Sequence, residues 1–316
     1  MTLIKTGGKL YLATMFGLTT AVISGTNNFL TKIAVTAIKD PVLFTTLKNA
    51  IVAAFLIGAI LMLKKLPEIL SLTKSQLIKL IAIGVIGGSL PFALFFIGLQ
   101  KTSALNAGLI HKTLFIWVLL MAIPLLKEKL VWQQWVGVTA IFGANLAVGG
   151  FTGFKYNTGE LMIFAATILW AVENIIAKIT LKDVSSITVA AFRMTLGTII
   201  LLIILIWRGA FFGAVFDLNA TQWGWALLTS ILLLGYVTTW YAALKRAPAS
   251  YVATLLVPAT LVTNILSAVF VAGSLTIQQV ASSALFLAGL GVMILFAKKT
   301  AGFTATEHIF EIKQPS

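Results

Sequence analysis

The residues of this sequence that could do chemistry are a few ionisable side chains inside long apolar runs. His111 and Lys112 stand side by side in the run from 106 to 126, and Lys48 lies in another. A charge in apolar surroundings is costly unless it has a partner or faces water. Lys112 and Lys48 are therefore candidates for binding a carboxylate or another anionic group of a substrate, with His111 beside them. Two other interpretations of Lys112 stay open, a deprotonated buried lysine and a lysine bonded to a backbone carbonyl, and His111 could simply pack.

A second set of polar side chains recurs at helical spacing. Asn28 belongs to a stripe with Ser24 and Thr20, and Asn174 belongs to a similar stripe further along the chain. Such stripes line a cavity or join helices by hydrogen bonds, and both interpretations stay open. Asn28 and Asn174 are our candidates for hydrogen-bonding a substrate.

Glu173 and Arg193 are the remaining charges inside apolar runs. Each lies five or six residues from the same end of its run, roughly 8 to 9 Å deep for a helix. Their matching depths predict a buried pair that acts as a gate or holds the structure together.

Several kinds of chemistry lack the residues they need. The chain has no cysteine and two histidines far apart, which argues against disulfides, thiolate chemistry and a histidine metal site. No serine, histidine and acid set occurs within the apolar runs, as a hydrolase or transferase would need. We therefore expect no catalytic residue, no metal and no cofactor. Six aromatic residues could stack on an aromatic ligand, although packing explains them as well: Phe95, Phe96, Phe115, Trp117, Trp240 and Tyr241.

The elements that must position these residues are transmembrane helices. Hydrophobic residues make up 59% of the 316, and charged residues make up 10%, whereas soluble domains carry about 25% charged residues. About 20 apolar residues are needed for a helix to cross the hydrocarbon core. Ten runs qualify, at 10–31, 44–63, 77–99, 103–125, 131–149, 159–178, 187–207, 222–243, 249–271 and 276–296. The sequence therefore predicts an all-α membrane protein with ten transmembrane helices.

The net charge of +14 follows the expected topology. With the N-terminus in the cytoplasm, fifteen lysines and arginines fall in cytoplasmic segments and five fall on the opposite side. This bias obeys the positive-inside rule. We therefore expect a multi-pass protein of the cell membrane with both termini cytoplasmic, and a lipid bilayer rather than nucleic acid as the partner of the basic residues.

The chain also repeats itself. The segment NNFLTKIA (27–34) aligns with ENIIAKIT (173–180), and LVWQQWVG (130–137) aligns with LTIQQVAS (275–282) at an offset of 145 residues. Five helices per copy is an odd number, so the second copy should be inverted relative to the first, as in many secondary transporters. The expected organisation is a first five-helix repeat at 1–150, a linker at 151–158, a second repeat at 159–297 and a polar cytoplasmic tail at 298–316.

These features together resemble the EamA-type members of the drug/metabolite transporter superfamily. The resemblance rests on the order of ten runs, their duplication, and LLKEKLVWQQWVG after the fourth run. It implies an exporter or permease for small metabolites. Two positions depart from the family pattern. The glutamate after the fourth run is present as Glu128, but Gly273 takes its place in the second copy, and the proline of the ninth run, Pro258, corresponds to Thr113 in the fourth.

The sequence thus favours a secondary transporter that moves an amino acid or another carboxylate-bearing solute by alternating access. A non-transporting scaffold or sensor and, less well supported, an intramembrane enzyme are the alternatives. A coupling proton carried by Glu173 or His111 is a further option, and the sequence leaves the oligomeric state open.

Overall fold

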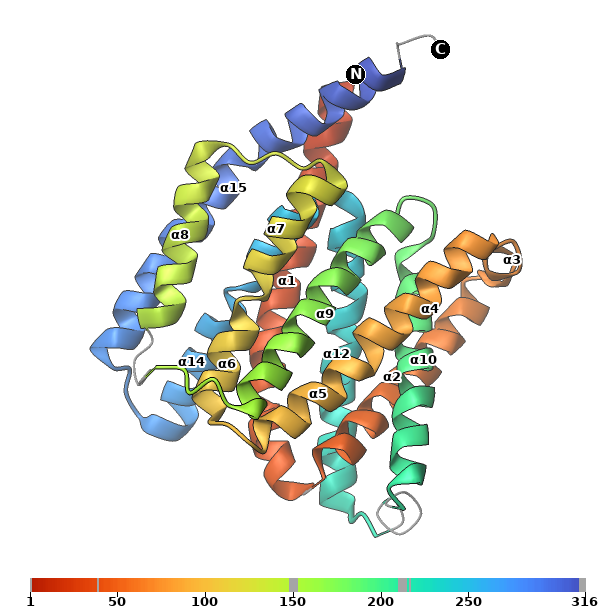
Figure 1. The fold of residues 1–316 in the computed structure, drawn as a ribbon, viewed down its shortest axis with the longest axis vertical. Coiled ribbons are helices and arrows are strands. Elements are labelled where there is room, and N and C mark those ends of the chain that lie inside the picture. Colours follow the sequence, from red (N-terminus) through yellow and green to blue (C-terminus); the bar gives the residue numbers. More distant parts are fainter. Residues whose placement is uncertain (1, 39, 148–152, 210–214, 216, 313–316) are drawn as a thin grey trace.

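The fold is described from a computed structural model that covers residues 2–38, 40–147, 153–209, 215 and 217–312. Within these residues the secondary structure is entirely helical (Figure 1). The first half comprises α1 (Thr2–Ala37), α2 (Pro41–Met62), α3 (Leu66–Leu70), α4 (Lys74–Gly88), α5 (Leu90–Leu99), α6 (Ala104–Lys112), α7 (Leu114–Leu126) and α8 (Trp132–Ala147). The second half comprises α9 (Thr158–Thr180), α10 (Ser186–Trp207), α12 (Ala220–Arg246), α13 (Ala249–Leu256), α14 (Ala259–Ser267), the π-helix η1 (Ala268–Ala272) and α15 (Ile277–Ile312).

Each of the ten apolar runs coincides with a helix or with consecutive helices. Eight of the resulting segments in the described part of the chain are long and apolar enough to cross a membrane. The two runs outside this set are α1 and α8, and α8 has only 16 residues. The chain is therefore a multi-pass membrane protein. Residues 151 and 152 of the expected linker and 313–316 of the expected tail lie outside the described residues, and α15 extends through the rest of that tail.

Helix ends form where the sequence supplies capping side chains. Thr73 and Gln76 make a reciprocal capping box at the start of α4, and Asn219 and Gln222 make another at the start of α12. These bonds satisfy backbone amides that have no partner within the helix. Local sequence thus determines where several membrane helices begin.

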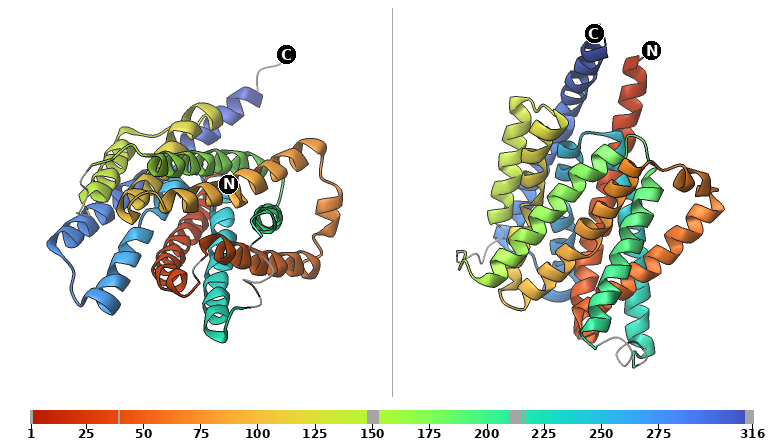
Figure 2. Two further views of the ribbon diagram at one scale, coloured as in Figure 1. Left: turned by 60° about the horizontal axis from the view of Figure 1, so that its bottom comes forward. Right: turned by 45° about the vertical axis from the view of Figure 1, so that its right-hand side comes forward.

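The bundle is built around α1, α9 and α12 (Figure 1). Helix α1 packs against α12, α13 and α14, while α9 packs against α4, α5, α6 and α7. Helices α2 and α4 pack on α10, and α8 pairs with α15 at the opposite edge (Figure 2). The first turns of α1 and the last turns of α15 lie at the same end of the molecule.

Small residues allow the closest helix contacts. Gly88 of α4 and Gly197 of α10 meet backbone to backbone, so a Cβ added to Gly197 would lie 2.5 Å from the Gly88 carbonyl oxygen. Gly137 of α8 and Gly289 of α15 meet in the same way, at 2.9 Å. In lipid, van der Waals packing of this kind drives helix association.

Candidate functional site

Three runs that were expected to be continuous helices are broken near their middles. One break lies at Ser89, between α4 and α5, and the other two correspond to each other in the two repeats. Helix α6 ends at Lys112 and α7 begins at Leu114, with Thr113 between them. Its hydroxyl donates to the carbonyl of Ile110 at 2.6 Å and accepts from the Trp117 indole at 2.9 Å. The side chain of Thr113 therefore takes part in the hydrogen bonding of the break.

The corresponding break lies at Val257 and Pro258, between α13 and α14. Proline lacks an amide hydrogen, and its ring clashes with the carbonyl four residues earlier, so the helix cannot continue regularly. Val257 and Pro258 are 145 residues beyond Lys112 and Thr113, so the two breaks match in the repeat alignment. Discontinuous membrane helices are tolerated where the irregular backbone lies within protein or lines a cavity.

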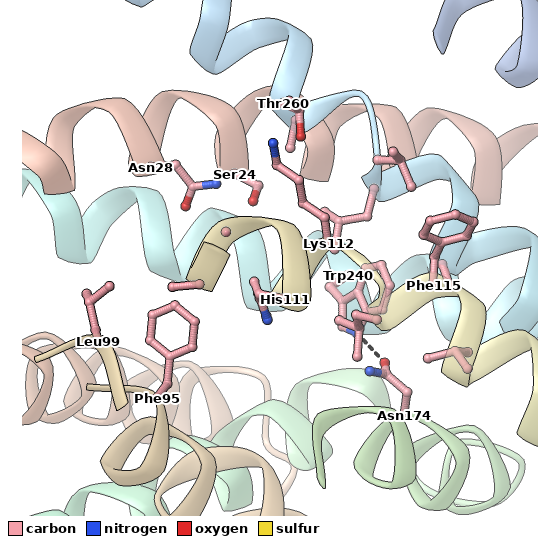
Figure 3. Close-up of a pocket in the computed structure, with 18 residues that line it drawn as sticks. Ser24, Asn28, Phe95, Leu99, His111, Lys112, Phe115, Asn174, Trp240 and Thr260 are labelled. Carbon is pink, nitrogen blue, oxygen red and sulfur yellow. Dashed lines mark hydrogen bonds between the residues drawn. The ribbon is translucent and has the colours of Figure 1, made fainter. Parts of the chain in front are cut away.

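Both breaks border one cavity of about 390 Å³. It is lined by residues of α1, α5, α6, α7, α9, α12, α13 and α14 (Figure 3). Lys112, His111, Asn28 and Asn174, all candidates from the sequence, contribute to this lining, and Val257 does so as well. The tertiary structure therefore brings together four of the five expected substrate ligands.

Lys112 supplies the positive charge of the cavity. It is half-buried, and its amino group has no hydrogen-bond or ion-pair partner among the described residues. In Figure 3 its side chain extends from the break toward Ser24 of α1 and Thr260 of α14. An unpartnered ammonium at this position is free to bind an anionic group of a ligand.

Three neutral polar side chains of the same cavity also lack partners within the described part of the chain. They are Ser24 and Asn28 of α1 and Thr260 of α14. Thr260 was not recognised from the sequence, although a threonine two residues after Pro258 is a polar side chain beside a helix break. Ser24 was placed in the polar stripe of α1 but not among the candidate ligands. The other member of that stripe, Thr20, is buried and bonded to Thr239 at 2.7 Å, so the stripe serves both packing and the cavity.

Asn174 and His111 are more constrained. The Asn174 oxygen accepts from the Trp240 indole at 3.0 Å, and its amide donates to the Trp170 carbonyl at 2.8 Å. The His111 ring contacts the rings of Phe95 and Trp170 at centroid distances of 5.4 and 4.9 Å, and its Nδ1 is buried without a partner in the described residues. Asn174 therefore mainly positions Trp240, while His111 is held by ring contacts and neither of its nitrogens has a hydrogen-bond partner among the described residues.

Lys48 does not belong to this cavity lining. Its amino group lies 3.5 Å from both the Asn27 side-chain oxygen and the Thr31 hydroxyl, and 5.0 Å from the ring centroid of Phe44. The fold supplies three neutral neighbours for this lysine, from α1 and α2. Lys48 is a buried cation held by polar and aromatic neighbours.

Glu173 and Arg193 lie near each other on α9 and α10, but no ion pair joins them in the described structure. Glu173 accepts from the Tyr241 hydroxyl at 2.5 Å, and Arg193 donates to the Gly87 carbonyl at 3.1 Å. Both side chains pack against Gly87, and the Arg193 Nε has no partner among the described residues. The two side chains thus lie at matching depth, but each forms its hydrogen bonds with a different partner. Their role as a gate or structural pair stays a prediction.

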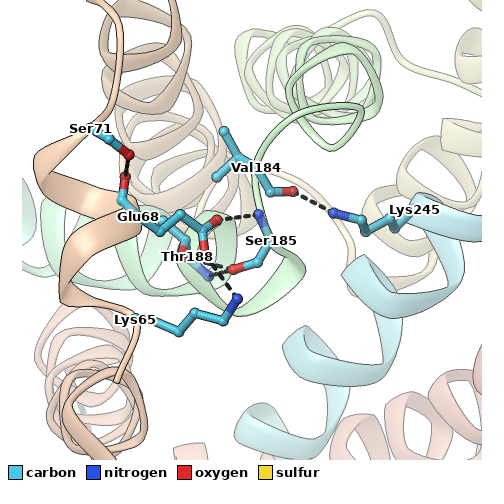
Figure 4. Close-up of polar contacts among 7 residues, drawn as sticks. All are labelled: Lys65, Glu68, Ser71, Val184, Ser185, Thr188 and Lys245. Atoms are coloured by element: carbon cyan, nitrogen blue, oxygen red, sulfur yellow. Dashed lines mark hydrogen bonds and ion pairs between the residues drawn. The ribbon is translucent and has the colours of Figure 1, made fainter. Parts of the chain in front are cut away.

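One end of the bundle is held together by Glu68 of the short helix α3 (Figure 4). Its carboxylate accepts from the backbone amide of Ser185, the N-cap of α10, at 2.6 Å, and pairs with Lys65 at 3.1 Å. Lys245 of α12 donates to the adjacent Val184 carbonyl at 2.8 Å. Partial burial by itself would raise the pKa of Glu68, but the bonds to Ser185 and Lys65 lower that pKa below its usual value. The negative charge of Glu68 thus favours this contact.

A profile of the EamA-like transporter family matches residues 12–149 and again residues 157–295. The chain belongs to the EamA-like transporter family. This confirms the resemblance expected from the sequence and the presence of two repeats.

Relatives agree with this assignment. YvbV of Bacillus subtilis, named an uncharacterized transporter, is 28% identical over 283 residues, which cover 84% of this chain and 86% of YvbV. YyaM of the same organism, also named an uncharacterized transporter, is 28% identical over 141 residues, so the match spans only 46% of YyaM. One crystal structure superimposes with a TM-score of 0.75 at 20% identity, covering 91% of this chain and 98% of the other, and it supports the fold alone.

The glutamate expected of EamA-like sequences has a structural role here. The Glu128 carboxylate is buried after α7 and accepts from the backbone amides of Ala249 and Ser250 at 2.6 and 3.0 Å. It also accepts from the Ser250 hydroxyl at 2.5 Å. Pro248, the N-cap of α13, makes no side-chain capping bond. A residue of the first repeat therefore caps the broken helix of the second.

The corresponding position of the second repeat, Gly273, has a left-handed backbone conformation. Gly273 ends η1 with φ of +74°, a backbone conformation that glutamate rarely adopts. At the start of α6, Ser103 supplies the cap, and Glu160 of α9 accepts from the Asn106 side chain at 2.6 Å. The two broken helices are thus anchored differently, α13 through its backbone and α6 partly through a side-chain amide.

Proposed function

We infer that this EamA-like protein is a secondary transporter that carries a small, carboxylate-bearing metabolite across the cell membrane by alternating access around the central cavity. It does so with ten membrane-spanning segments in two inverted five-helix repeats, and both termini lie in the cytoplasm. Ligand sites at the interface of such repeats, formed by discontinuous helices, are typical of secondary transporters.

Three observations support this arrangement. The ten apolar runs coincide with helical segments, five within each of the two family matches. The first turns of α1 and the last turns of α15 lie at one end of the molecule, as an even number of crossings requires. Lys112 and Val257, directly before the two matched breaks at Thr113 and Pro258, both line the cavity.

The observation that carries the proposal is Lys112. Its unpartnered amino group lies in the cavity that Ser24 and Thr260 also line, and the equivalent residue of the other repeat, Val257, lines the same cavity without a charge. The helix break therefore does not need a cation for packing. A buried charge without a structural partner is explained by a ligand that supplies the opposite charge.

The alternative classes fit these features less well. A scaffold or sensor has no need of a cavity of about 390 Å³ that contains an unpaired lysine. An intramembrane enzyme needs a nucleophile with a base or a metal site, and the described residues contain no group of three or more potential metal ligands of the His, Cys, Asp and Glu types. Membership in a transporter family also argues for transport.

Transport by proteoliposomes tests the proposal. Purified protein is reconstituted and counterflow of radiolabelled organic acids, amino acids, nucleosides and amines is measured for the parent and for Lys112→Met. We expect the parent to transport a carboxylate-bearing solute. In Lys112→Met the transport rate at low substrate concentration should fall about tenfold or more, which corresponds to a loss of about 1.4 kcal/mol in binding free energy.

The matched control is Lys155→Met, which also replaces a lysine by methionine but at an exposed position outside the cavity lining. It should retain most of the activity. Equal transport by Lys112→Met and the parent would remove Lys112 as a ligand, and absence of transport of the whole panel would favour the scaffold or sensor.

A further inference from the structure

The polar part of the cavity contains donors that the protein does not use. Ser24, Asn28 and Thr260 carry hydroxyl or amide hydrogens, and their side chains have no partner among the described residues. They lie on the side toward which Lys112 extends (Figure 3). One cation and three neutral donors together suit an anionic group that has an additional oxygen beside it.

The same cavity offers little to a second, positive group on the ligand. No aspartate or glutamate is among the lining residues. Two of the carbonyls at the breaks are engaged, because Ile110 accepts from Thr113 and Val257 accepts from the Thr260 amide. An ammonium one carbon away from a carboxylate bound at Lys112 would meet a like charge without a compensating acid.

The rest of the lining is apolar. Phe95, Phe115, Trp240 and Leu256 contribute rings and an aliphatic side chain to the cavity wall. A volume of about 390 Å³ lies at the lower end of the range for small-molecule sites. The wall therefore suits one compact apolar body, such as a single ring.

We propose that the substrate of this cavity is an apolar 2-hydroxy or 2-oxo carboxylate, a monoanion without an ammonium group, rather than an amino acid. This inference rests on the proposed function and narrows it. The carboxylate binds Lys112, the oxygen on the adjacent carbon accepts from Ser24, Asn28 or Thr260, and the apolar body packs against the aromatic wall. An amino acid of the same shape places its ammonium near Lys112. The hydroxyl and amide oxygens there can accept from that ammonium, but the lining has no aspartate or glutamate to balance the two positive charges.

Isothermal titration of the full-length protein in detergent with three probes of similar shape tests this assignment. Phenyllactate has the hydroxyl and carboxylate, phenylalanine has an ammonium in place of the hydroxyl, and phenethylamine lacks the carboxylate. We expect phenyllactate to bind at least tenfold more tightly than phenylalanine, and phenethylamine to give no measurable binding. Lys112→Met should abolish the preference for phenyllactate, while Lys155→Met, which removes an exposed lysine outside the cavity lining, should retain it.

Equal or tighter binding of phenylalanine would overturn the proposed class, and so would the absence of binding by all three probes. Neither result would contradict transport as such, because the liposome panel tests transport with other solutes. Phenyllactate binding that is unchanged in Lys112→Met would overturn the assignment of its carboxylate to this lysine. The double variant Ser24→Ala and Thr260→Val keeps Lys112, and it should reduce the ratio of the phenylalanine Kd to the phenyllactate Kd several-fold. An unchanged ratio would contradict the role of these hydroxyls.

Discussion

Replacement of Glu128 should destabilise the protein more than its position in a connecting segment suggests. Its buried carboxylate accepts from the two amides of Ala249 and Ser250 and from the Ser250 hydroxyl. In Glu128→Ala these donors lose their partner, and each unsatisfied buried donor costs about 1 to 3 kcal/mol. For the two amides alone this gives about 2 to 6 kcal/mol, and relief of the buried charge offsets part of it. We expect a net loss of about 3 kcal/mol in the free energy of unfolding.

The assay is reversible unfolding of the purified protein in mixed detergent micelles, followed by tryptophan fluorescence. Glu68→Ala is the matched control, because Glu68 also accepts from a helix N-cap amide, that of Ser185, but is partly exposed. Its loss should be about 1 kcal/mol or less. Glu128→Gln, which keeps one acceptor, should fall between the two. A loss below about 1 kcal/mol for Glu128→Ala would refute the conclusion that this carboxylate anchors α13.

The remaining predictions concern topology, the buried charges and pH. A cysteine introduced at the exposed Lys155 of this cysteine-free chain should react with an impermeant thiol reagent from outside intact cells; labelling only after lysis would contradict the orientation. In double-mutant cycles of thermal stability, Glu173→Gln and Tyr241→Phe should be coupled by about 1 kcal/mol or more. The effects of Glu173→Gln and Arg193→Met should be closer to additive. A larger coupling energy for Glu173 with Arg193 than for Glu173 with Tyr241 would show that the direct charge pair dominates. Because the pKa of Glu68 is lowered in the fold, its contribution is complete above the unfolded pKa of about 4.3 and is lost as pH falls through the folded pKa. The stability difference between the parent and Glu68→Gln, measured from pH 6 downward, should therefore shrink in that acidic range, and a constant difference would contradict the assignment.

Much of the fold could be predicted because the relevant signals are local. A run of about 20 apolar residues demands a helix in a bilayer wherever it occurs, so each run coincides with one helix or with consecutive helices, while the short α3 lies between two runs. The offset of 145 residues also indicated that Thr113 corresponds to Pro258. What it did not predict is that α6 and α7 separate at Thr113 as well, because threonine does not prevent helix formation as proline does.

The candidate site was predicted in part. Residue type and depth indicated Lys112, His111, Asn28 and Asn174, which meet at the cavity, but the same reasoning included Lys48, which lies among Asn27, Thr31 and Phe44 instead. Depth along a helix follows from counting residues. The direction in which a side chain points depends on how that helix is rotated against its neighbours.

The sequence by itself determined that this chain is a membrane protein with two related halves, because hydrophobicity, charge bias and repetition are properties of segments. Only the tertiary structure decided which polar groups are left without a hydrogen-bond or ion-pair partner. The Trp240 indole donates a hydrogen bond to the Asn174 oxygen, and the Tyr241 hydroxyl donates one to the Glu173 carboxylate, which makes no direct bond to Arg193. Lys112 is left without a partner among the described residues. The physical reason is that a hydrogen bond requires its two atoms within about 3 Å, and residues far apart in sequence reach that distance only when the helices pack.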